Sequence, residues 1–294
     1  MFIKTVIKTP AKINLCLDIT GTTPDGFHSL RTVMQTVNLY DYLFVETGGQ
    51  GISLSGNLRY IPYNESNLVY KAAAAFYEAA GLPPQVRIRM CKHIPVQAGM
   101  GGGSGNAAGI LEGLNAIYGN PLTRETLYDI CLSLGSDVPY FLMGGTALCE
   151  GRGEILTKLP DLPDCHLVLA KGRAGVSTKV AFADIDSCTE LPPFVCDGMI
   201  QAIEKGDLSG VCQNIGNTFL PSVSSRCEAV AEQMEALSQF SPHVGLTGSG
   251  SAVFAVFDQK EQAVACHQTL RGKYPFVCMT RPVTGGTIII EDKE

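Results

Sequence analysis

The stretch PVQAGMGGGSGNAAGILEGLN, residues 95–115, joins a glycine-rich segment to the start of an apolar pattern at helical spacing. Ile110, Leu111 and Leu114 fall on one face of the predicted helix. Clustered glycines leave backbone N–H groups open to a ligand, and the positive end of the following helix attracts anions. We therefore expect residues 99–106 to bind phosphate groups. A tight turn without a ligand is the alternative.

Three types of nucleotide-binding loop can be compared with this segment. A Walker A loop ends in Gly-Lys-Ser or Gly-Lys-Thr, and GGGSGNAA has no lysine there. A dinucleotide fingerprint opens a helix soon after the first strand and needs an acidic residue about 20 positions later. Gly99, Gly101 and Ser104 only approximate that spacing, and the loop lies far from the N-terminus. The remaining interpretation is a triphosphate-binding loop of another kind, with its helix running from Ser104.

Length and composition narrow the functional class. The 294 residues carry a formal net charge of -6 without a lysine or arginine run, which argues against a nucleic-acid partner. No stretch approaches the roughly 18 apolar residues that span a bilayer, so no membrane partner is expected. The N-terminus alternates like a strand rather than a leader, and the 11 cysteines form no C-x-x-C pair. These features predict a cytoplasmic protein and leave its oligomeric state open.

Strands and helices follow each other without strict β-α alternation, which is typical of the α+β class. The first 60 residues alternate as strands, with a loop at TTPDGFHSL. Helices are predicted at 67–80, after the glycine loop to Ile117, and at 123–134, 197–213, 222–238 and 261–271. Further strands are predicted at 85–95, in a hairpin at 144–159, and at 161–172 and 243–258. We divide the chain into an N-terminal domain, residues 1–158, and a C-terminal domain, residues 159–294.

Four motifs occur in a recognisable order: PAKINLCL (10–17), IPVQAGMGGGSGNAAG (94–109), GSDVPYFLMGG (135–145) and GLTGSGSAVFAVF (245–257). On these residues the chain resembles the GHMP kinase superfamily, and within it the kinases of the non-mevalonate isoprenoid pathway. The resemblance implies an N-terminal α/β domain and a ferredoxin-like C-terminal domain, with the active site between them. It also implies ATP and Mg²⁺ as cofactors and a cytidyl diphosphate sugar alcohol as the small-molecule substrate, phosphorylated on its 2-hydroxyl.

The resemblance assigns the glycine-rich loop to ATP. The loop residues implied are Pro95, Ala98, Gly99, Met100, Gly101, Gly102, Gly103, Ser104, Gly105 and Asn106. The superfamily loop more often reads Gly-Gly-Gly-Ser-Ser, and Gly105 stands in place of the second serine. Ser104 is therefore the loop side chain expected to contact a phosphate or Mg²⁺. Asn67 and Lys92 match residues of the adenine pocket, although a helix cap and a solvated strand charge are their ordinary interpretations.

Asp137 and Lys12 are the candidate catalytic residues. Asp137 precedes Val138 and Pro139, which do not continue a helix, and an aspartate in such a turn can face a cleft as a base or simply bond its own backbone. Lys12 lies inside the apolar strand AKINLCL, where it is either a gatekeeper of a strand edge or a cation in the cleft. The resemblance implies that the two act as a pair.

The resemblance also assigns substrate-binding residues. Asn14 would contact the polyol, and Phe27 and His28 lie at a turn. His28 would face the edge of the cytosine, and Phe182 would stack on the cytosine ring. A satisfied surface histidine and a core phenylalanine are the ordinary alternatives. In GLTGSGSA, the N–H and hydroxyl groups of Thr247, Gly248 and Ser249 would close on the substrate diphosphate, unless the segment is a simple hairpin turn.

Other functions remain open on the sequence. A kinase of this superfamily could phosphorylate another small alcohol, such as homoserine or a mevalonate derivative. A nucleotide-sensing module with an inactive kinase fold is a second alternative, and the presence of both Lys12 and Asp137 argues against it. A dinucleotide-dependent oxidoreductase is the third and weakest alternative, because the glycine loop fits the dinucleotide-binding fingerprint poorly.

Overall fold

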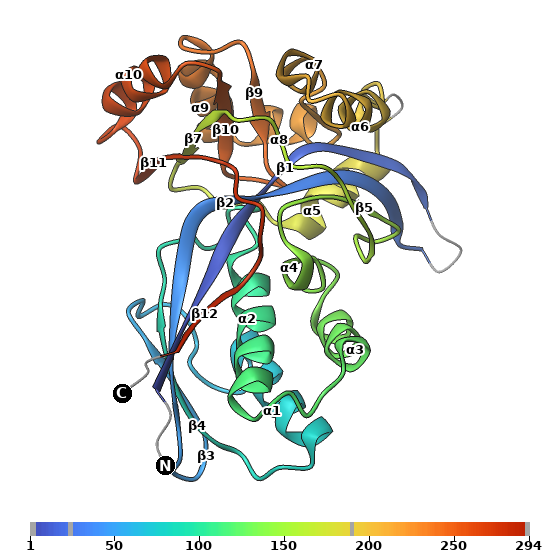
Figure 1. The fold of residues 1–294 in the computed structure, drawn as a ribbon. Coiled ribbons are helices and arrows are strands. Elements are labelled where there is room, and N and C mark those ends of the chain that lie inside the picture. The colour runs from blue at the N-terminus through green and yellow to red at the C-terminus, as the bar shows by residue number, and fades with distance from the viewer. Residues whose placement is uncertain (1–3, 23–25, 189–190, 292–294) are drawn as a thin grey trace.

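A long β-hairpin forms the spine of the molecule (Figure 1). The computed structural model describes residues 4–22, 26–188 and 191–291. Strand β1 (Lys4–Thr22) pairs antiparallel with β2 (His28–Thr47), and three register shifts bend the pair. One half of this hairpin belongs to the lower unit of Figure 1 and the other half runs beneath the upper unit. Residues near the bend therefore lie where the two units meet.

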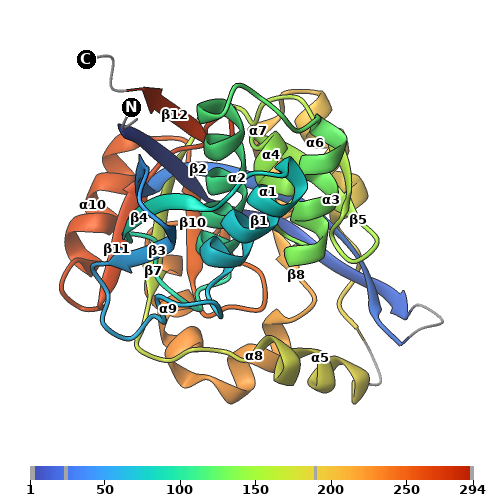
Figure 2. The ribbon, with the colours of Figure 1, turned by 90° about the horizontal axis from the view of Figure 1, so that it is seen from below.

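The N-terminal unit is a mixed sheet with helices on one face (Figures 1 and 2). Strands β3 (Gly51–Gly56), β4 (Gln85–Cys91) and β12 (Ile288–Glu291) extend the hairpin. The order of the strands is β12-β1-β2-β4-β3. Every second side chain of β4 is buried against the helices, as the alternating sequence predicts. The helices are α1 (Leu68–Ala80), α2 (Gly102–Ile117) and α3 (Arg124–Leu134).

Polar caps and glycines set the ends of two helices where the sequence predicts them. The side chain of Asn67 caps α1, which ends at Gly81 in the left-handed region with φ 64°. The side chain of Thr123 caps α3, which ends at Gly135. A short helix, α4 (Tyr140–Met143), follows Pro139. The predicted hairpin is confirmed as β5 (Thr146–Glu150) and β6 (Ile155–Lys158), with β5 pairing to β2.

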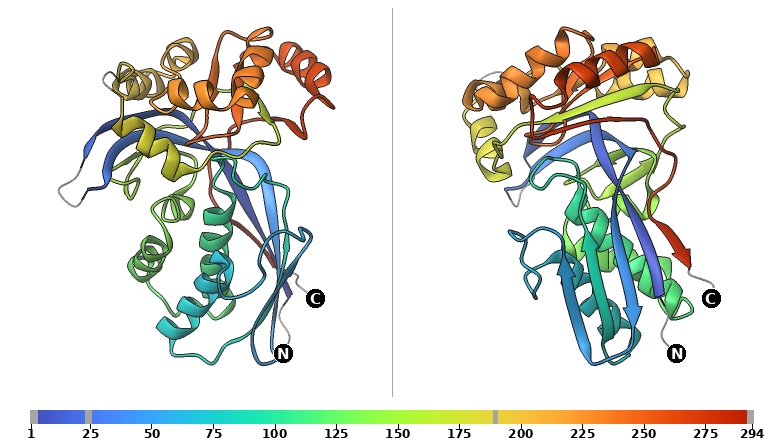
Figure 3. Two further views of the ribbon diagram at one scale, coloured as in Figure 1. Left: turned by 180° about the vertical axis from the view of Figure 1, so that it is seen from behind. Right: turned by 90° about the vertical axis from the view of Figure 1, so that its left-hand side faces the viewer.

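The C-terminal unit is built on a four-stranded antiparallel sheet in the order β11-β7-β10-β9. Its elements are β7 (His166–Lys171), α9 (Glu228–Ser238), β9 (Val244–Leu246), β10 (Val253–Phe257), α10 (Lys260–Leu270) and β11 (Phe276–Thr280). This βαββαβ order is the ferredoxin-like arrangement that the motifs imply. Helices α9 and α10 cover one face (Figure 3), and the other face packs on the hairpin through residues such as Leu167 and Leu169.

Two long helices predicted for the C-terminal unit are wrong, because each is broken in two. The segment predicted at 197–213 forms α6 (Cys196–Glu204) and α7 (Leu208–Gln213), separated by Gly206 at φ 64°. The segment predicted at 222–238 forms α8 (Leu220–Arg226) and α9, separated by Cys227 in a non-helical conformation. A further helix, α5 (Thr178–Asp186), carries Phe182.

The end of the chain returns to the N-terminal sheet. Strand β12 (Ile288–Glu291) pairs with β1 from Lys8 to Thr5, so the two termini lie at the same end of the molecule (Figure 1). A two-residue strand, β8 (Gly216–Asn217), also pairs with β1. The hydrogen bonds of β12 thus tie a segment after residue 159 to the first unit. Among the described residues, no helix is both long and apolar enough to cross a bilayer.

Candidate active site

The glycine-rich loop lies at the junction of the two units, and its glycines have packing reasons of their own. Gly99 and Gly101 have φ 71° and 69°, where a side chain is strained. A Cβ on Gly99 would lie 2.1 Å from the carbonyl O of Thr247, and one on Gly101 would lie 2.5 Å from Cζ of Phe141. Helix α2 begins at Gly102, two residues before the predicted Ser104. The loop is therefore shaped both for close backbone contact and for open N–H groups.

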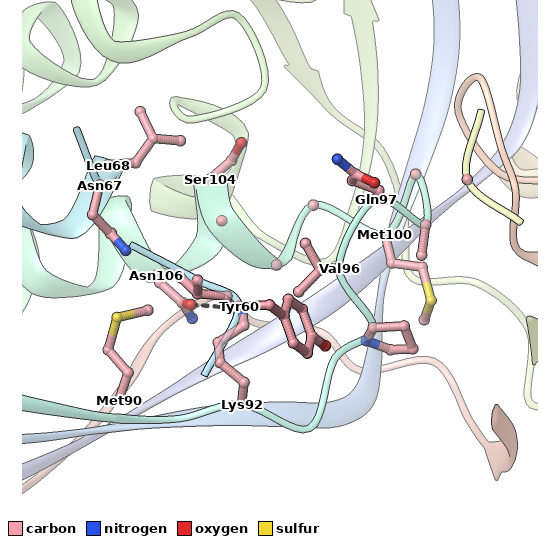
Figure 4. Close-up of a pocket in the computed structure, with 18 of the residues that line it drawn as sticks. Tyr60, Asn67, Leu68, Met90, Lys92, Val96, Gln97, Met100, Ser104 and Asn106 are labelled. Carbon is pink, nitrogen blue, oxygen red and sulfur yellow. Dashed lines mark hydrogen bonds between the residues drawn. The ribbon is translucent and has the colours of Figure 1, made fainter. Parts of the chain in front are cut away.

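A cavity of about 710 Å³ opens beside the loop (Figure 4). Of the predicted ATP-binding residues, it is lined by Asn67, Lys92, Pro95, Ala98, Gly99, Met100, Gly101, Gly102, Gly103, Ser104 and Asn106. Gly105 is not among the lining residues. A Cβ on Gly105 would lie 3.1 Å from Cε1 of Phe141 and 3.3 Å from the carbonyl O of Pro10. The second serine of the usual motif would be crowded here by the Phe141 ring.

Sequence reasoning missed several residues of this cavity. The further lining residues include Tyr60, Gln97, Lys171 and Arg173. Tyr60 is 72% exposed, and Figure 4 shows it beside Val96 at the cavity. Lys171 and Arg173 come from the C-terminal unit, where Lys171 ends β7 and Arg173 follows two positions later. Gln97 lies inside the motif at 94–109, whereas Tyr60, Lys171 and Arg173 belong to no motif and only folding brings them to the loop.

Lys92 is a buried ion-pair partner, so its interpretation as a solvated strand charge is wrong. Its ammonium donates to the Asp41 carboxylate and to Asn106 Oδ1, at 2.8 Å in the second case. Asp41 is fully buried, and it also accepts the backbone N–H groups of His93 and Ile94. A buried lysine needs such a partner because water no longer solvates its charge.

Asn67 performs the capping role that local sequence predicts while it lines the cavity. Its Oδ1 accepts the N–H of Val69 at 2.9 Å, and its Nδ2 donates to the carbonyl O of Pro62 at 2.7 Å. The second bond holds the segment that carries Tyr60 against the start of α1. The amide of Asn67 therefore shapes this wall of the cavity.

Lys12 and Asp137 face each other beside the glycine loop. Lys12 Nζ lies 3.7 Å from Asp137 Oδ2, with side chains 3% and 41% exposed respectively. The Lys12 backbone N–H donates to the carbonyl O of Met100, and its Cγ would be 3.0 Å from a Cβ on Gly101. The ammonium thus emerges under the loop toward a carboxylate that solvent can reach.

The turn that carries Asp137 is held by its neighbours. Val138 is fully buried, and its N–H donates to the carbonyl O of Gly135 at 3.1 Å. Burial, together with the Asp137 charge, raises the pKa of the Cys149 thiol well above its ordinary value. Cys149 therefore stays a neutral thiol near the pair, and Asp137 is the group there suited to take a proton.

Asn14 joins the Lys12 ammonium to the second predicted loop. Its Oδ1 accepts from Lys12 Nζ at 2.6 Å and from the Gly248 N–H at 2.9 Å, and its Nδ2 donates to Thr32 Oγ1 at 2.8 Å. Thr247 Oγ1 donates to the carbonyl O of Gly99 at 3.0 Å. The turn that contains Thr247 and Gly248 is thereby docked against both Lys12 and the glycine loop.

Ser249 belongs to the same turn and points toward α5. Its hydroxyl lies 2.8 Å from Thr178 Oγ1. Strands β9 and β10 are neighbours in the sheet, so the turn between them is also a hairpin connection, as the alternative interpretation holds. The hairpin and the close approach to the glycine loop are compatible, because Thr247 of the connection donates to the carbonyl O of Gly99.

His28 and Phe182 stack on one another near the tip of the long hairpin. Their ring centroids lie 4.5 Å apart at an interplanar angle of 24°. His28 Nε2 lies 2.7 Å from Asp186 Oδ1, so α5 supplies both partners of the histidine. Phe27 is 53% exposed, and the Cζ atom of Arg152 lies over its ring, 3.7 Å from the ring centroid. The structure thus brings the predicted residues His28 and Phe182 together as a stacked pair.

The described residues contain no group of three or more His, Cys, Asp or Glu side chains that could hold a metal ion. The oxygen donors near the loop include the hydroxyl of Ser104 and the carboxylate of Asp137. Mg²⁺ prefers oxygen ligands and usually keeps several waters while it binds substrate phosphates. This donor set fits a metal ion that arrives with the nucleotide rather than one held in a protein cage.

Comparison with known proteins shows which family the chain resembles. It matches the GHMP kinases N terminal domain over residues 67–145 and the GHMP kinases C terminal family over residues 199–275. It is similar to the 4-diphosphocytidyl-2-C-methyl-D-erythritol kinase of Clostridium perfringens, with 39% identity over 96% of this chain and 99% of that protein. The protein of the same name from Exiguobacterium sibiricum is 42% identical over 91% of this chain and 94% of its own length.

Solved structures agree with these relatives. A crystal structure of 4-(cytidine 5'-diphospho)-2C-methyl-D-erythritol kinase matches with a TM-score of 0.82 and 30% identity, over 95% of this chain and 100% of that chain. A homoserine kinase from Cytophaga hutchinsonii matches with a TM-score of 0.74 but 17% identity, which shows the shared fold alone. The two-domain GHMP kinase fold predicted from the motifs is confirmed. The chain therefore belongs to the 4-diphosphocytidyl-2-C-methyl-D-erythritol kinases of the GHMP kinase superfamily and is a small-molecule kinase.

Proposed function

We propose that the protein transfers the γ-phosphoryl group of ATP to the 2-hydroxyl of 4-diphosphocytidyl-2-C-methyl-D-erythritol. The observation that supports this most directly is the approach of Lys12 Nζ to Asp137 Oδ2, 3.7 Å apart beside the glycine loop. A base and a cation beside a loop that can bind phosphates are what phosphoryl transfer to an alcohol requires. The names of the relatives supply the acceptor.

In this mechanism the Asp137 carboxylate takes the proton of the acceptor hydroxyl. The hydroxyl oxygen forms a bond to the γ-phosphorus while the bond from that phosphorus to the bridging oxygen of ADP breaks. Lys12 stabilises the charge on the attacking oxygen and holds the aspartate in place. Asn14 fixes the ammonium through its 2.6 Å hydrogen bond, so it acts by positioning Lys12.

The glycine loop would hold the phosphates through backbone N–H groups. The amides at the start of α2 lack helical acceptors and point out of the helix, where its dipole is positive. Ser104 would hold Mg²⁺ together with phosphate oxygens, and the metal ion would offset charge on the transferred group. Asn67, Lys92 and Tyr60 would enclose the adenosine end of the cavity.

His28 and Phe182 would bind the cytosine. The base would enter between or beside the two rings, which now stack at 4.5 Å, and Asp186 would fix the tautomer of His28. Thr247, Gly248 and Ser249 would contact the diphosphate. Binding energy gained this far from the reacting oxygen orients the hydroxyl in line with the γ-phosphate.

The division into domains at residues 158 and 159 belongs to the same proposal. The C-terminal domain would close on the substrate, with β12 as a strap back to the first sheet. We also propose that the enzyme acts in the cytoplasm on small molecules, without a nucleic-acid or membrane partner, because its net charge of -6 comes without a basic run.

An acceptor panel with coupled detection of ADP tests the proposed function. The panel contains 4-diphosphocytidyl-2-C-methyl-D-erythritol, the same sugar alcohol without cytidine, homoserine and mevalonate. We expect turnover with the first compound and a kcat/KM at least about a hundredfold lower with the others, because they lack the remote binding group. Faster turnover with homoserine or mevalonate would overturn the acceptor assignment.

A further inference from the structure

Two cations of the C-terminal unit reach the cavity beside the glycine loop. Lys171 is the last residue of β7 and Arg173 lies two positions further on. Both line the cavity of about 710 Å³ that also contains Gly101, Gly102 and Ser104. The cavity is otherwise lined by N-terminal residues, apart from Gly175 in the same segment. The segment after β7 is thus the side of the C-terminal unit that faces the loop.

Buried hydrogen bonds hold this segment in place. The Gly172 N–H donates to Oε1 of Gln233 at 2.8 Å, and Gln233 is fully buried on α9. The hydroxyl of Ser251 donates to the carbonyl O of Ala174 at 2.5 Å. A Cβ on Gly175 would lie 3.2 Å from Oε1 of Gln97, a residue of the glycine loop. The two cations are therefore carried by a fixed backbone that touches the loop.

Among the residues that the structure describes, no acidic side chain forms an ion pair with the positive charges of this segment. Lys171 Nζ donates to the carbonyl oxygens of Gly172 and Ala174, at 3.2 and 3.3 Å. None of the ion pairs formed within residues 4–22, 26–188 and 191–291 involves Lys171 or Arg173. Partial burial lowers the pKa of Lys171, since carbonyl dipoles replace only part of its hydration.

The third cation of the cavity, Lys92, differs in this respect. Its charge is offset by the buried carboxylate of Asp41. The net positive charge facing the loop therefore comes from Lys171 and Arg173. A half-buried ammonium and an exposed guanidinium at the mouth of a cavity gain energy from an anion there, and phosphate oxygens match both donors.

We propose that Lys171 and Arg173 bind the β- and γ-phosphates of the nucleotide from the C-terminal unit, so that the bound triphosphate bridges the two units. The proposal rests on the proposed function in taking ATP as the nucleotide. The nucleotide is preferred over the diphosphate of the acceptor because both cations share one cavity with Tyr60 and Asn67, whereas His28 and Phe182 lie outside that lining. Phosphate contacts from both sides would couple nucleotide binding to closure of the cleft.

Calorimetric titration with ATP, ADP and AMP tests the proposal without any acceptor. The proteins are wild type, Lys171→Met, Arg173→Met, the double variant and the conservative Lys171→Arg. Lys205→Met, an exposed lysine at the end of α6, is the matched control. We expect the Kd for ATP to rise about tenfold for each lost charge and the Kd for AMP to change less than about twofold. Lys171→Arg should stay close to wild type, and Lys205→Met should be silent.

Three results would overturn the proposal. The first is a double variant that binds ATP within about twofold of wild type while its melting temperature is unchanged. The second is an unaltered Kd for ATP combined with a raised KM for the cytidyl acceptor, which would assign the cations to the acceptor diphosphate. The third is an equal loss of ATP and AMP binding, because AMP lacks the phosphates concerned. A wild-type enzyme that binds ATP but leaves the cytidyl compound unphosphorylated would refute the proposed acceptor and leave the titration valid.

Discussion

Lys12 and Lys92 are two lysines buried under the same glycine loop, and their surroundings differ. Lys92 contacts the fully buried carboxylate of Asp41 and the amide of Asn106. Lys12 donates to Asn14 at 2.6 Å, and the carboxylate that faces it, on Asp137, lies 3.7 Å away and is 41% exposed. The charge of Lys92 is therefore neutralised inside the protein, whereas the carboxylate that faces Lys12 is also open to solvent.

The difference shows how partner exposure separates a structural lysine from a chemical one. Asp41 accepts from the Lys92 ammonium, from Asn106 Nδ2 and from two backbone N–H groups, so its oxygens are occupied. Asp137 lies on a turn where an alcohol can approach its carboxylate. A buried pair with every acceptor used is a stability element, and a half-exposed pair is available for proton transfer.

The largest effect is expected for Asp137→Asn. The amide keeps the shape of the side chain but cannot take the hydroxyl proton, so kcat should fall about a thousandfold. The Kd for ATP should stay within about twofold, because the glycine loop is intact. Steady-state kinetics and nucleotide titration measure the two quantities. Asp129→Asn, an exposed change on α3, is the matched control, and near-normal turnover of Asp137→Asn would remove it from the base role.

Lys12→Met should lower kcat by about a hundredfold, since the charge that stabilises the attacking oxygen is lost. The unbranched side chain of Met fills much of the same space, so the melting temperature should change little. Lys8→Met on the same strand, where the ammonium lies over the Tyr40 ring, serves as the control. A loss of stability without a loss of kcat would show that Lys12, like Lys92, has a structural role, and would contradict the distinction between the two lysines.

Asp41→Asn should act on stability instead. Removal of the carboxylate leaves the Lys92 ammonium buried without a counter-charge, and the free energy of unfolding should fall by about 3 kcal/mol. Urea unfolding measures this change, again with Asp129→Asn as control. At a temperature where the variant is folded, kcat should remain within about threefold of wild type. A drop in kcat as large as that of Lys12→Met, with stability unchanged, would contradict the assignment.

The smallest effect is expected for His28→Ala, which should change substrate binding and leave the chemical step unaltered. Loss of the ring that stacks on Phe182 should raise the KM for the cytidyl acceptor about tenfold while the KM for ATP is unchanged. His267→Ala on α10, in the C-terminal unit, is the histidine control. Equal changes in both KM values would show that His28 does not serve the cytosine.

Much of the fold was predictable where local chemistry decides it. Asn67 and Gly81 bound α1 as expected, because a side-chain cap and a left-handed glycine act within a few residues. The helices expected at 197–213 and 222–238 were wrong, since Gly206 and Cys227 interrupt them. Periodicity counts apolar positions and does not register a single residue that leaves the helical conformation.

The candidate site was predictable only in its motif residues. The motifs predict Lys12, Asp137 and the glycine loop, and folding brings these together beside one cavity. Tyr60, Lys171 and Arg173 carry no motif, so no pattern indicated them. The interpretation of Lys92 as a solvated charge failed for the same reason, because its partner lies 51 residues away on another strand.

The amino-acid sequence by itself determined the order of the motifs, the ends of the capped helices and the superfamily, since each depends on neighbouring residues. Only the tertiary structure decided which charges meet. Asp41 contacts Lys92, β12 pairs with β1, and the end of β7 with the residues after it brings Lys171 and Arg173 to the loop. These pairings depend on burial across the whole chain, where the desolvation of each charge is settled by what packs around it.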